Sequence, residues 1–278
     1  KLKELDLSFT EESVSAAGWG TFFVLLRNPN SALENLHLSA NNIIDGSVAL
    51  VVDALGSISS LKYLDLRSNH SIIASGWMTL SNLLRHPNCI LEELHLEDND
   101  DSINDEVVIA FANSLANNIS LKALCLGDYS GIIGDNTNIT PRGWSALANT
   151  LCNKSSIDSI YASNHTLQTG SFSESDLLID LPSDFVSSLQ LNQNNNKFEV
   201  AREKILQHHF CNGDINIQEL LEIELQVMCH AIAWIGRDGT GFPLLYHLVR
   251  SMPALFDFDS QGKANGTGAK RQRICEKG

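Results

Sequence analysis

One short phrase recurs along the chain and constrains its fold more than any other feature. It has three aliphatic or apolar residues at positions one, four and six, and variable residues between them. Five copies start at residues 2, 33, 61, 91 and 121, and a degraded sixth copy starts at residue 157. A unit repeated at such regular spacing cannot bury its apolar face alone, so it must stack against its neighbours. The sequence therefore predicts an array of stacked units.

Each phrase is predicted to be a short strand that points positions one, four and six into the core. Apolar residues recur at helical spacing between the phrases. The predicted helices lie within residues 14–30, 45–59, 72–88, 104–120 and 139–155. In three of them a Gly-Trp pair occupies an equivalent position, which predicts that Trp19, Trp77 and Trp144 are core aromatics. We expect parallel strands on the inside of a curve and helices outside it.

The phrase "LEELHLEDND", from Leu91 to Asp100, shows the pattern most clearly. It resembles the strand segment of a leucine-rich repeat, and the two alternating helix types resemble the ribonuclease-inhibitor-like class of such proteins. The resemblance covers residues 1–165 and implies an α/β solenoid shaped like a horseshoe. It implies little about the ligand, because function on this scaffold depends on the exposed strand positions.

Beyond the repeats, residues 166–258 are predicted to form a linker and a helical C-terminal cap, with a separate partner-binding helical module as the alternative. Helical spacing is present in 196–210, 216–236 and 241–256. The stretch "WIGRDGTGFPLLYHLVRSMPALFD" resembles the tail of uncharacterised diatom leucine-rich-repeat proteins, which implies no activity. Residues 259–278 are polar, glycine-containing and basic, which predicts a disordered tail.

The charge of the chain narrows the class of partner. Its net charge is −14, and residues 1–260 hold 14 basic and 32 acidic side chains. Such a body repels phosphate backbones, so we expect no nucleic-acid binding and instead a protein partner with a basic or mixed surface. No apolar stretch reaches the length of a membrane span, so we expect no membrane partner.

The six cysteines lack the C-x-x-C spacing of zinc or redox motifs, and four lie in apolar phrases. This pattern predicts free thiols in a reducing, intracellular compartment, with the cytoplasm as the expected location. The basic stretch "KRQR" at 270–273 has the composition of a nuclear address, which is the alternative.

The outward-facing strand positions supply the candidate contacts. Position five of successive copies carries an alternation of acid and histidine that should run as a column across neighbouring strands, namely Asp6, His37, Asp65, His95, Cys125 and Tyr161. We expect acids and histidines in this column to solvate one another. Together with flanking positions, the predicted partner-binding surface comprises Asp6, His37, Tyr63, Asp65, Arg67, Glu93, His95, Glu97, Asp98 and Tyr161.

A metal or general acid–base site built from Asp65, His95 and Cys125 is the sharper hypothesis. Side chains of adjacent parallel strands project in the same direction, which is a poor arrangement for enclosing a tetrahedral ion. No nucleophile–base pair or oxyanion hole is evident in the sequence. We therefore predict no catalytic residue, no metal and no cofactor, so that the chain is not an enzyme.

These features together predict a non-catalytic protein-interaction scaffold that binds its partner on an acidic concave face. One alternative is a leucine-rich-repeat protein that regulates a GTPase, because some members of the resembled class use an arginine for this purpose. Arg67 would then be the candidate arginine. A second alternative is the sensing end of a larger receptor.

Overall fold

The computed structural model describes residues 2–10, 14–99, 102–126, 138–169 and 182–209 together with Val227, and all structural statements below concern these residues. The chain forms two compact units. The first comprises residues 1–152 and 163–197, and the second comprises residues 153–162 and 198–278. The predicted helices at 216–236 and 241–256 and the predicted disordered tail lie outside the described residues.

The first unit is an α/β structure whose five parallel strands form one sheet in the order β1-β2-β3-β4-β5. The strands are β1 (Glu4–Asp6), β2 (Asn35–His37), β3 (Tyr63–Asp65), β4 (Glu93–His95) and β5 (Ala123–Cys125). Leu5, Leu36, Leu64, Leu94 and Leu124 are aligned at the centre of the sheet. The strands and the alignment of their fifth positions confirm the prediction from the repeated phrase.

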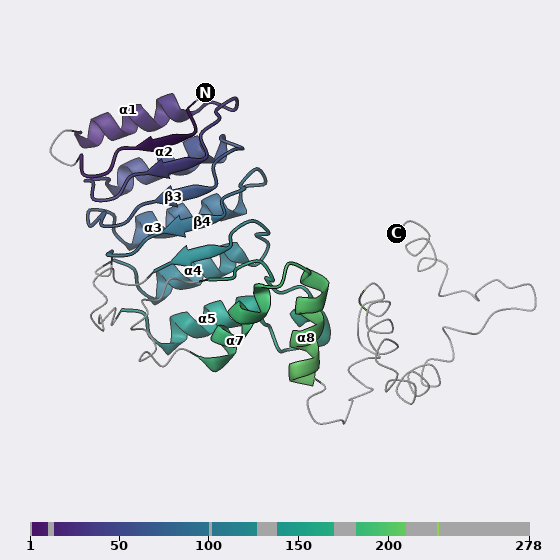
Figure 1. Cartoon of the computed structure of the whole chain (residues 1–278). Helices are drawn as coiled ribbons and strands as arrows, with labels where there is room; N and C mark the ends of the chain where they lie inside the picture. The colour runs from purple at the N-terminus through teal and green to yellow at the C-terminus, as the bar shows by residue number, and fades with distance from the viewer. Residues whose placement is uncertain are drawn as a thin grey trace, which may run out of the picture. The chain divides into compact units, whose positions relative to one another are not determined.

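A helix follows each strand in this unit, and neighbouring helices pack in the same order as the strands (Figure 1). They are α1 (Ala16–Leu26), α2 (Asp45–Gly56), α3 (Ala74–Ser81), the 3-10 turn η1 (Asn82–Arg85), α4 (Asp105–Leu115) and α5 (Pro141–Leu151). Each begins inside its predicted range. At α5 the hydroxyl oxygen of Thr140 accepts a hydrogen bond from the Arg142 backbone N–H, and Pro141 occupies the first turn.

The core lies between the sheet and these helices. Positions one, four and six of the fourth phrase are Leu91, Leu94 and Leu96, and each is at most 1% exposed. Trp19, Trp77 and Trp144 are buried as well, which confirms that the Gly-Trp pairs supply core aromatics. The apolar pattern of the sequence therefore identifies the buried face of both strands and helices.

The sixth phrase was assigned to the wrong residues. The predicted strand at residue 157 is a short helix, α6 (Ile157–Tyr161), whose start is capped by the Ser156 hydroxyl accepting from the Ser159 backbone N–H. The segment that pairs with β5 lies ten residues later: Thr169 forms a parallel bridge with Ala123.

Asn164 explains where the sheet continues. Its side-chain oxygen accepts from the backbone N–H groups of Thr166 and Leu167, as the oxygen of Asn118 does from Ser120 and Leu121 in the preceding repeat. Leu167 therefore takes the place of Leu121, and Leu167 is buried like it. The degraded phrase at Ile157 lacks such an asparagine three residues before it, since Lys154 stands there.

Two further helices follow, α7 (Ser183–Asn192) and α8 (Lys197–His209). In the first unit, α7 packs on α5 through the rings of Trp144 and Phe185, whose centroids lie 6.0 Å apart. The Asn192 side chain donates to the Leu167 carbonyl at 2.6 Å, so α7 also binds the segment after the fifth helix. The second unit holds α6 and most of α8, with Val200 and Ile205 buried.

Gly76 lies where α3 meets the start of α2. A β-carbon at this position would lie 2.5 Å from Oδ1 of Asp45 and 2.7 Å from Cγ2 of Ile72. A shift of the Asp45 side chain would break two hydrogen bonds. Its Oδ1 accepts from the Ile73 backbone N–H at 2.8 Å, and its Oδ2 accepts from the Ser75 hydroxyl. Gly143 makes the same close approach to Asp105. Oδ1 of Asp105 accepts hydrogen bonds from the backbone N–H groups of Thr140 and Gly143. The glycine of each pair thus admits the carboxylate that joins two helices.

Gly76→Ala is expected to lower the free energy of unfolding by about 1–3 kcal/mol, because the added methyl group overpacks the site or displaces Asp45. Urea denaturation of both proteins measures the difference. Gly46→Ala is the matched control, since no atom among the described residues lies within 4 Å of its added β-carbon. It should leave stability unchanged or raise it by at most about 1 kcal/mol. Equal stability of Gly76→Ala and the unmodified chain would contradict the close approach.

Candidate functional site

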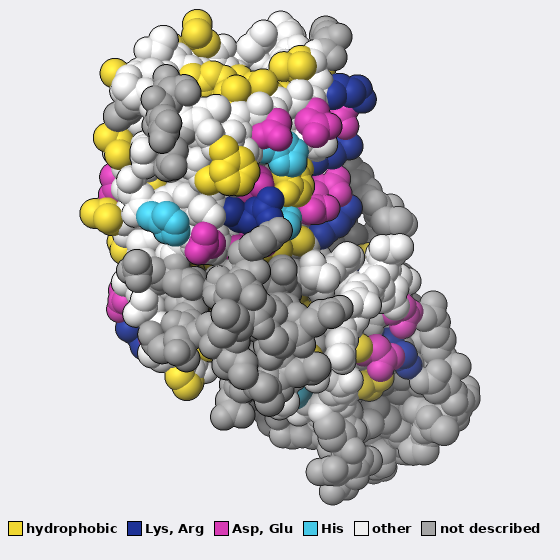
Figure 2. All heavy atoms as spheres, turned by 60° about the vertical axis from the view of Figure 1, so that its left-hand side comes forward, with side chains coloured by type: hydrophobic (Ala, Val, Ile, Leu, Met, Phe, Trp, Pro, Cys, Tyr) yellow, Lys and Arg dark blue, Asp and Glu magenta, His cyan; other side chains and the backbone are white. Residues whose placement is uncertain are grey.

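The outward side chains of β1–β5 form the candidate surface, which we call the strand face. It comprises, within the described residues, the second, third, fifth and seventh positions of the five phrases and the residue after the seventh. Acidic, basic and histidine side chains lie together on one face of the molecule in Figure 2. Glu4 and Glu93 are exposed there, whereas the leucines between them are buried, so the strands present a polar layer over an apolar one.

Three rings form the centre of this surface. Tyr63 lies between His37 and His95, with ring centroids 4.8 Å and 5.0 Å away. Burial, together with the nearby Asp65 carboxylate, raises the pKa of Tyr63 to about 12, so its phenol stays protonated. The parallel register places one ring on each of three consecutive strands, and neighbouring rings are tilted by 38° and 36°.

Asp65 does not form the predicted Asp–His pair with His95. It is only 1% exposed, and both of its carboxylate oxygens accept hydrogen bonds from the Arg67 guanidinium, at 3.0 Å and 2.7 Å. This bidentate pairing raises the pKa of Arg67 above its ordinary value against the opposing effect of burial. Asp65 binds Arg67 in preference to His95 because the planar guanidinium of Arg67 presents two parallel N–H donors that match the two carboxylate oxygens. Asp65 therefore makes the expected Asp–His contact with His37, whose Nδ1 lies 3.9 Å from its Oδ2, and not with His95.

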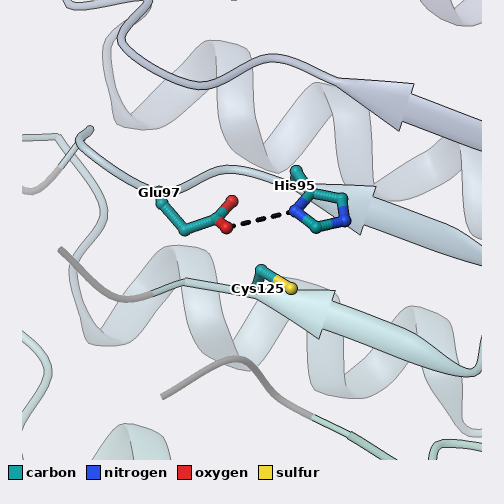
Figure 3. Close-up of side chains that lie close together, drawn as sticks. All are labelled: His95, Glu97 and Cys125. Atoms are coloured by element: carbon teal, nitrogen blue, oxygen red, sulfur yellow. Dashed lines mark hydrogen bonds and ion pairs between the residues drawn. The ribbon is translucent and has the colours of Figure 1, made fainter. Parts of the chain in front are cut away.

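His95 has a different set of partners. Its Nδ1 lies 3.1 Å from Oε1 of Glu97, its Nε2 lies 3.6 Å from Oε2 of Glu93, and Cys125 is aligned with it on β5. Figure 3 shows the Glu97 carboxylate directed at the His95 ring, with Cys125 on the adjacent strand. Burial disfavours a charged ring, but the interactions with Cys125 and Glu97 outweigh it and raise the pKa of His95 to about 10.

His95, Glu97 and Cys125 are the residues that could hold a metal ion in the described part of the chain. One potential ligand atom of each lies within 4.8 Å of the others. This group shares His95 and Cys125 with the sequence hypothesis of a site built from Asp65, His95 and Cys125, and Glu97 takes the place of Asp65. The spacing H-x-E in one phrase with cysteine in the next could have pointed to this group.

The remaining predicted contact residues lie at separate places. Asp6 is exposed on the edge strand, where backbone and side-chain hydrogen bonds from Ser8 lower its pKa. Asp98 lies in the turn after β4 with a left-handed φ of 59°, and its Oδ2 accepts from the Ser68 hydroxyl. Tyr161 is not part of the strand face, because it lies at the end of helix α6. Its inclusion in the predicted surface was wrong for the same reason as the sixth strand.

Sequence reasoning missed a row of ion pairs at position two. Lys3 and Lys62 both approach Glu34, with nitrogen–oxygen distances of 2.6 Å and 3.8 Å, and Lys122 lies 2.6 Å from Glu92. The signal was present, since position two alternates between lysine and glutamate in all five phrases. Such exposed pairs add little to stability because water and salt screen them, but the row neutralises one edge of the strand face.

Comparisons with known proteins add little to this description. No family model matches the chain, and no curated protein is similar to it. Among solved structures, the chain is similar to one described as "Leiomodin-1 Actin-Binding Site 2 (ABS2)", with 12% sequence identity and a TM-score of 0.36. That similarity covers 73% of this chain and 89% of the other. Similarity at this level carries no argument about function.

None of the helices that the structure describes combines the length and the apolar character that a bilayer span requires.

Proposed function

We propose that the chain is a leucine-rich-repeat protein of the ribonuclease-inhibitor-like class and that it binds a protein partner through its strand face without catalysis. In this proposal the parallel strands line the concave side of a horseshoe. The support is the repeated phrase together with five sequential parallel strands, each followed by a helix. Stacked repeats of this kind present an extended surface that suits macromolecular partners.

The observation that carries the proposal is the continuity of polar and aromatic groups across neighbouring strands. The rings of His37, Tyr63 and His95 lie side by side at the centre, and exposed carboxylates of Glu4 and Glu93 flank them. Protein interfaces are enriched in tyrosine and arginine at their centres and are polar at the rim. This arrangement matches such an interface better than it matches a small-molecule site, which needs a concave and mostly apolar pocket.

The charge of the strand face favours a basic or mixed-charge protein partner. Four basic residues, Lys3, Lys62, Arg67 and Lys122, stand against eight acidic ones: Glu4, Asp6, Glu34, Asp65, Glu92, Glu93, Glu97 and Asp98. The basic residues pair with Glu34, Asp65 and Glu92, so the excess is acidic. Complementary charge would speed association and exclude phosphate backbones and anionic membranes.

A reducing, intracellular compartment is part of the proposal. Cys89 and Cys125 are free thiols in the described residues, which is the pattern of proteins kept reduced. Nothing favours the GTPase-regulating alternative, because Nε and Nη2 of Arg67 are both occupied by Asp65, whereas a stimulating arginine must reach a phosphate on another protein.

Reversing the exposed acids should abolish partner capture. We expect the double variant Glu4→Lys, Glu93→Lys to lose the partners that the unmodified chain retains from native lysate, as measured by affinity capture and quantitative mass spectrometry. Glu97 stays unchanged because it is buried, and Asp98 because lysine is strained at its positive φ. Retained partners should also elute as salt is raised, because exposed charge pairs are screened.

The matched control is Asp53→Lys, Glu106→Lys, which makes the same charge change on helices α2 and α4, away from the strand face. It should keep the partners. Circular dichroism establishes that both variants are folded. Equal loss in the control would assign capture to net charge alone, and survival of every partner in the strand-face variant would rule out the proposed surface.

A further inference from the structure

His95, Glu97 and Cys125 form a compact donor set that shares only His95 with the ring cluster of the proposed protein-binding surface. His95 is the last residue of β4, Glu97 lies two residues after it, and Cys125 is the last residue of β5. Cys125 is 2% exposed, and the Glu97 and His95 side chains are 9% and 19% exposed. A thiol, an imidazole and a carboxylate thus meet in a partly dehydrated place on a rigid sheet.

Their spacing fits a shared zinc ion. Nitrogen and oxygen ligands each lie about 2.0–2.2 Å from zinc, so two of them at a tetrahedral angle lie about 3.3–3.6 Å apart. The observed distance between His95 Nδ1 and Glu97 Oε1 is 3.1 Å. The three potential ligand atoms lie within 4.8 Å of one another. Because a zinc–sulfur bond is about 2.3 Å long, a Cys125 sulfur at that largest distance must move roughly 1 Å closer to the nitrogen and oxygen ligands. A rotation about the Cα–Cβ bond of Cys125 would move its sulfur by that distance.

A buried polar atom points independently to a missing ligand. Oε2 of Glu97 has no hydrogen-bond partner among the described residues although the residue is only 7% exposed. Burying a carboxylate oxygen without a partner costs free energy, so native proteins rarely retain one unless it binds an ion or water. A cation between Glu97, His95 and Cys125 would satisfy it.

Glu93 lies near the His95 nitrogen where a metal-binding histidine usually has an outer partner, but Nε2 of His95 forms no hydrogen bond among the described residues. If Nδ1 of His95 binds the ion, Nε2 points to the Glu93 carboxylate, 3.6 Å away. Carboxylate–histidine–metal chains of this form fix the tautomer and the orientation of the ring. Glu93 and His95 lie on the same side of β4, because side chains alternate along a strand and these two residues are two positions apart.

We propose that His95, Glu97 and Cys125 form a zinc-binding site on the strand face, with a water molecule in the fourth coordination position. Thiolate and imidazole ligands favour zinc and similar transition metals over the hard ions Mg²⁺ and Ca²⁺, which require oxygen ligands. Three protein ligands with one open position are the arrangement of an accessible zinc centre rather than a closed structural one.

The experiment is titration of the metal-free full chain with Co²⁺ in reducing buffer, followed by absorption spectroscopy and then by competition with Zn²⁺. One equivalent of Co²⁺ should produce a thiolate-to-cobalt charge-transfer band, and one equivalent of Zn²⁺ should abolish it. Mg²⁺ should not compete. The absence of this band in the unmodified chain would overturn the proposal.

Variants assign the band to these residues. Cys125→Ser should abolish it, and Glu97→Gln should weaken Co²⁺ binding by at least about 100-fold, because loss of an outer partner alone costs about 10–100-fold. Glu93→Gln should weaken it within that smaller range. Cys89→Ser is the control with a thiol outside the site and should behave like the unmodified chain. A band that survives Cys125→Ser, or that is lost equally in Cys89→Ser, would place the metal elsewhere. The Glu97→Gln and Glu93→Gln variants retain the thiol, so they test the site even if Cys125→Ser does not fold.

Discussion

Trp77→Ala is expected to lower the free energy of unfolding by about 3–5 kcal/mol, the range for truncation of a fully buried large aromatic side chain. Trp77 lies in α3 and is fully buried, and its Nε1–H donates to the Ser102 hydroxyl at 2.8 Å. Removing the ring leaves a cavity between the helix and the sheet, where interlocked neighbouring repeats limit collapse. Urea denaturation of both proteins, analysed with the same transition slope, measures the loss.

Two further variants separate the contributions of the ring and its hydrogen bond. Trp77→Phe keeps part of the ring volume but not the donor, so we expect a smaller loss of about 1–2 kcal/mol. Met78→Ala, at the next and partly exposed position of the same helix, should cost less than about 1 kcal/mol. If Trp77→Ala were no worse than Met78→Ala, the core position of this tryptophan would be wrong.

The regular part of the fold could be predicted because each repeat has apolar residues at the same three positions. Leu91, Leu94 and Leu96 had to face the core once their spacing matched the other phrases, and the parallel register then followed from stacking. The sixth repeat failed because apolar spacing alone does not distinguish a strand from one turn of helix. The side chain of Asn164 accepts hydrogen bonds from the backbone at the start of the segment that does pair with β5, and this contact is visible only in the structure.

The candidate site was predicted less completely for a physical reason. Position alone shows which side chains share a face, and it brought His95 and Cys125 together correctly. Sequence position does not show which of several acidic side chains forms a hydrogen bond with a given basic side chain. Arg67 binds Asp65 with two hydrogen bonds, which leaves His95 to Glu97, and this competition depends on side-chain geometry rather than on spacing.

A chain of buried asparagines links the repeats at the turn after each strand. Asn41, Asn69 and Asn99 occupy the same repeat position and are at most 2% exposed. Each donates from its side-chain nitrogen to a carbonyl of its own repeat and to one of the preceding repeat. The residue before each of them, Ala40, Ser68 or Asp98, has a positive φ, so the chain turns sharply enough to bring the amide under the strand end.

Asn99→Ala is expected to lower the free energy of unfolding by about 3 kcal/mol. Its Nδ2 donates to the carbonyls of Leu66 and Leu96, and its Oδ1 accepts from the Asn69 backbone N–H at 2.8 Å, so alanine leaves several buried backbone groups unpaired. Each such group costs about 1–3 kcal/mol, partly offset by relaxation. Urea denaturation measures the loss, and Asn35→Ala, on the strand face, is the control expected to stay within about 0.5 kcal/mol. A loss for Asn99→Ala as small as that of Asn35→Ala would mean that these turns are held by leucine packing alone, because the amide links between repeats would then contribute no net stability.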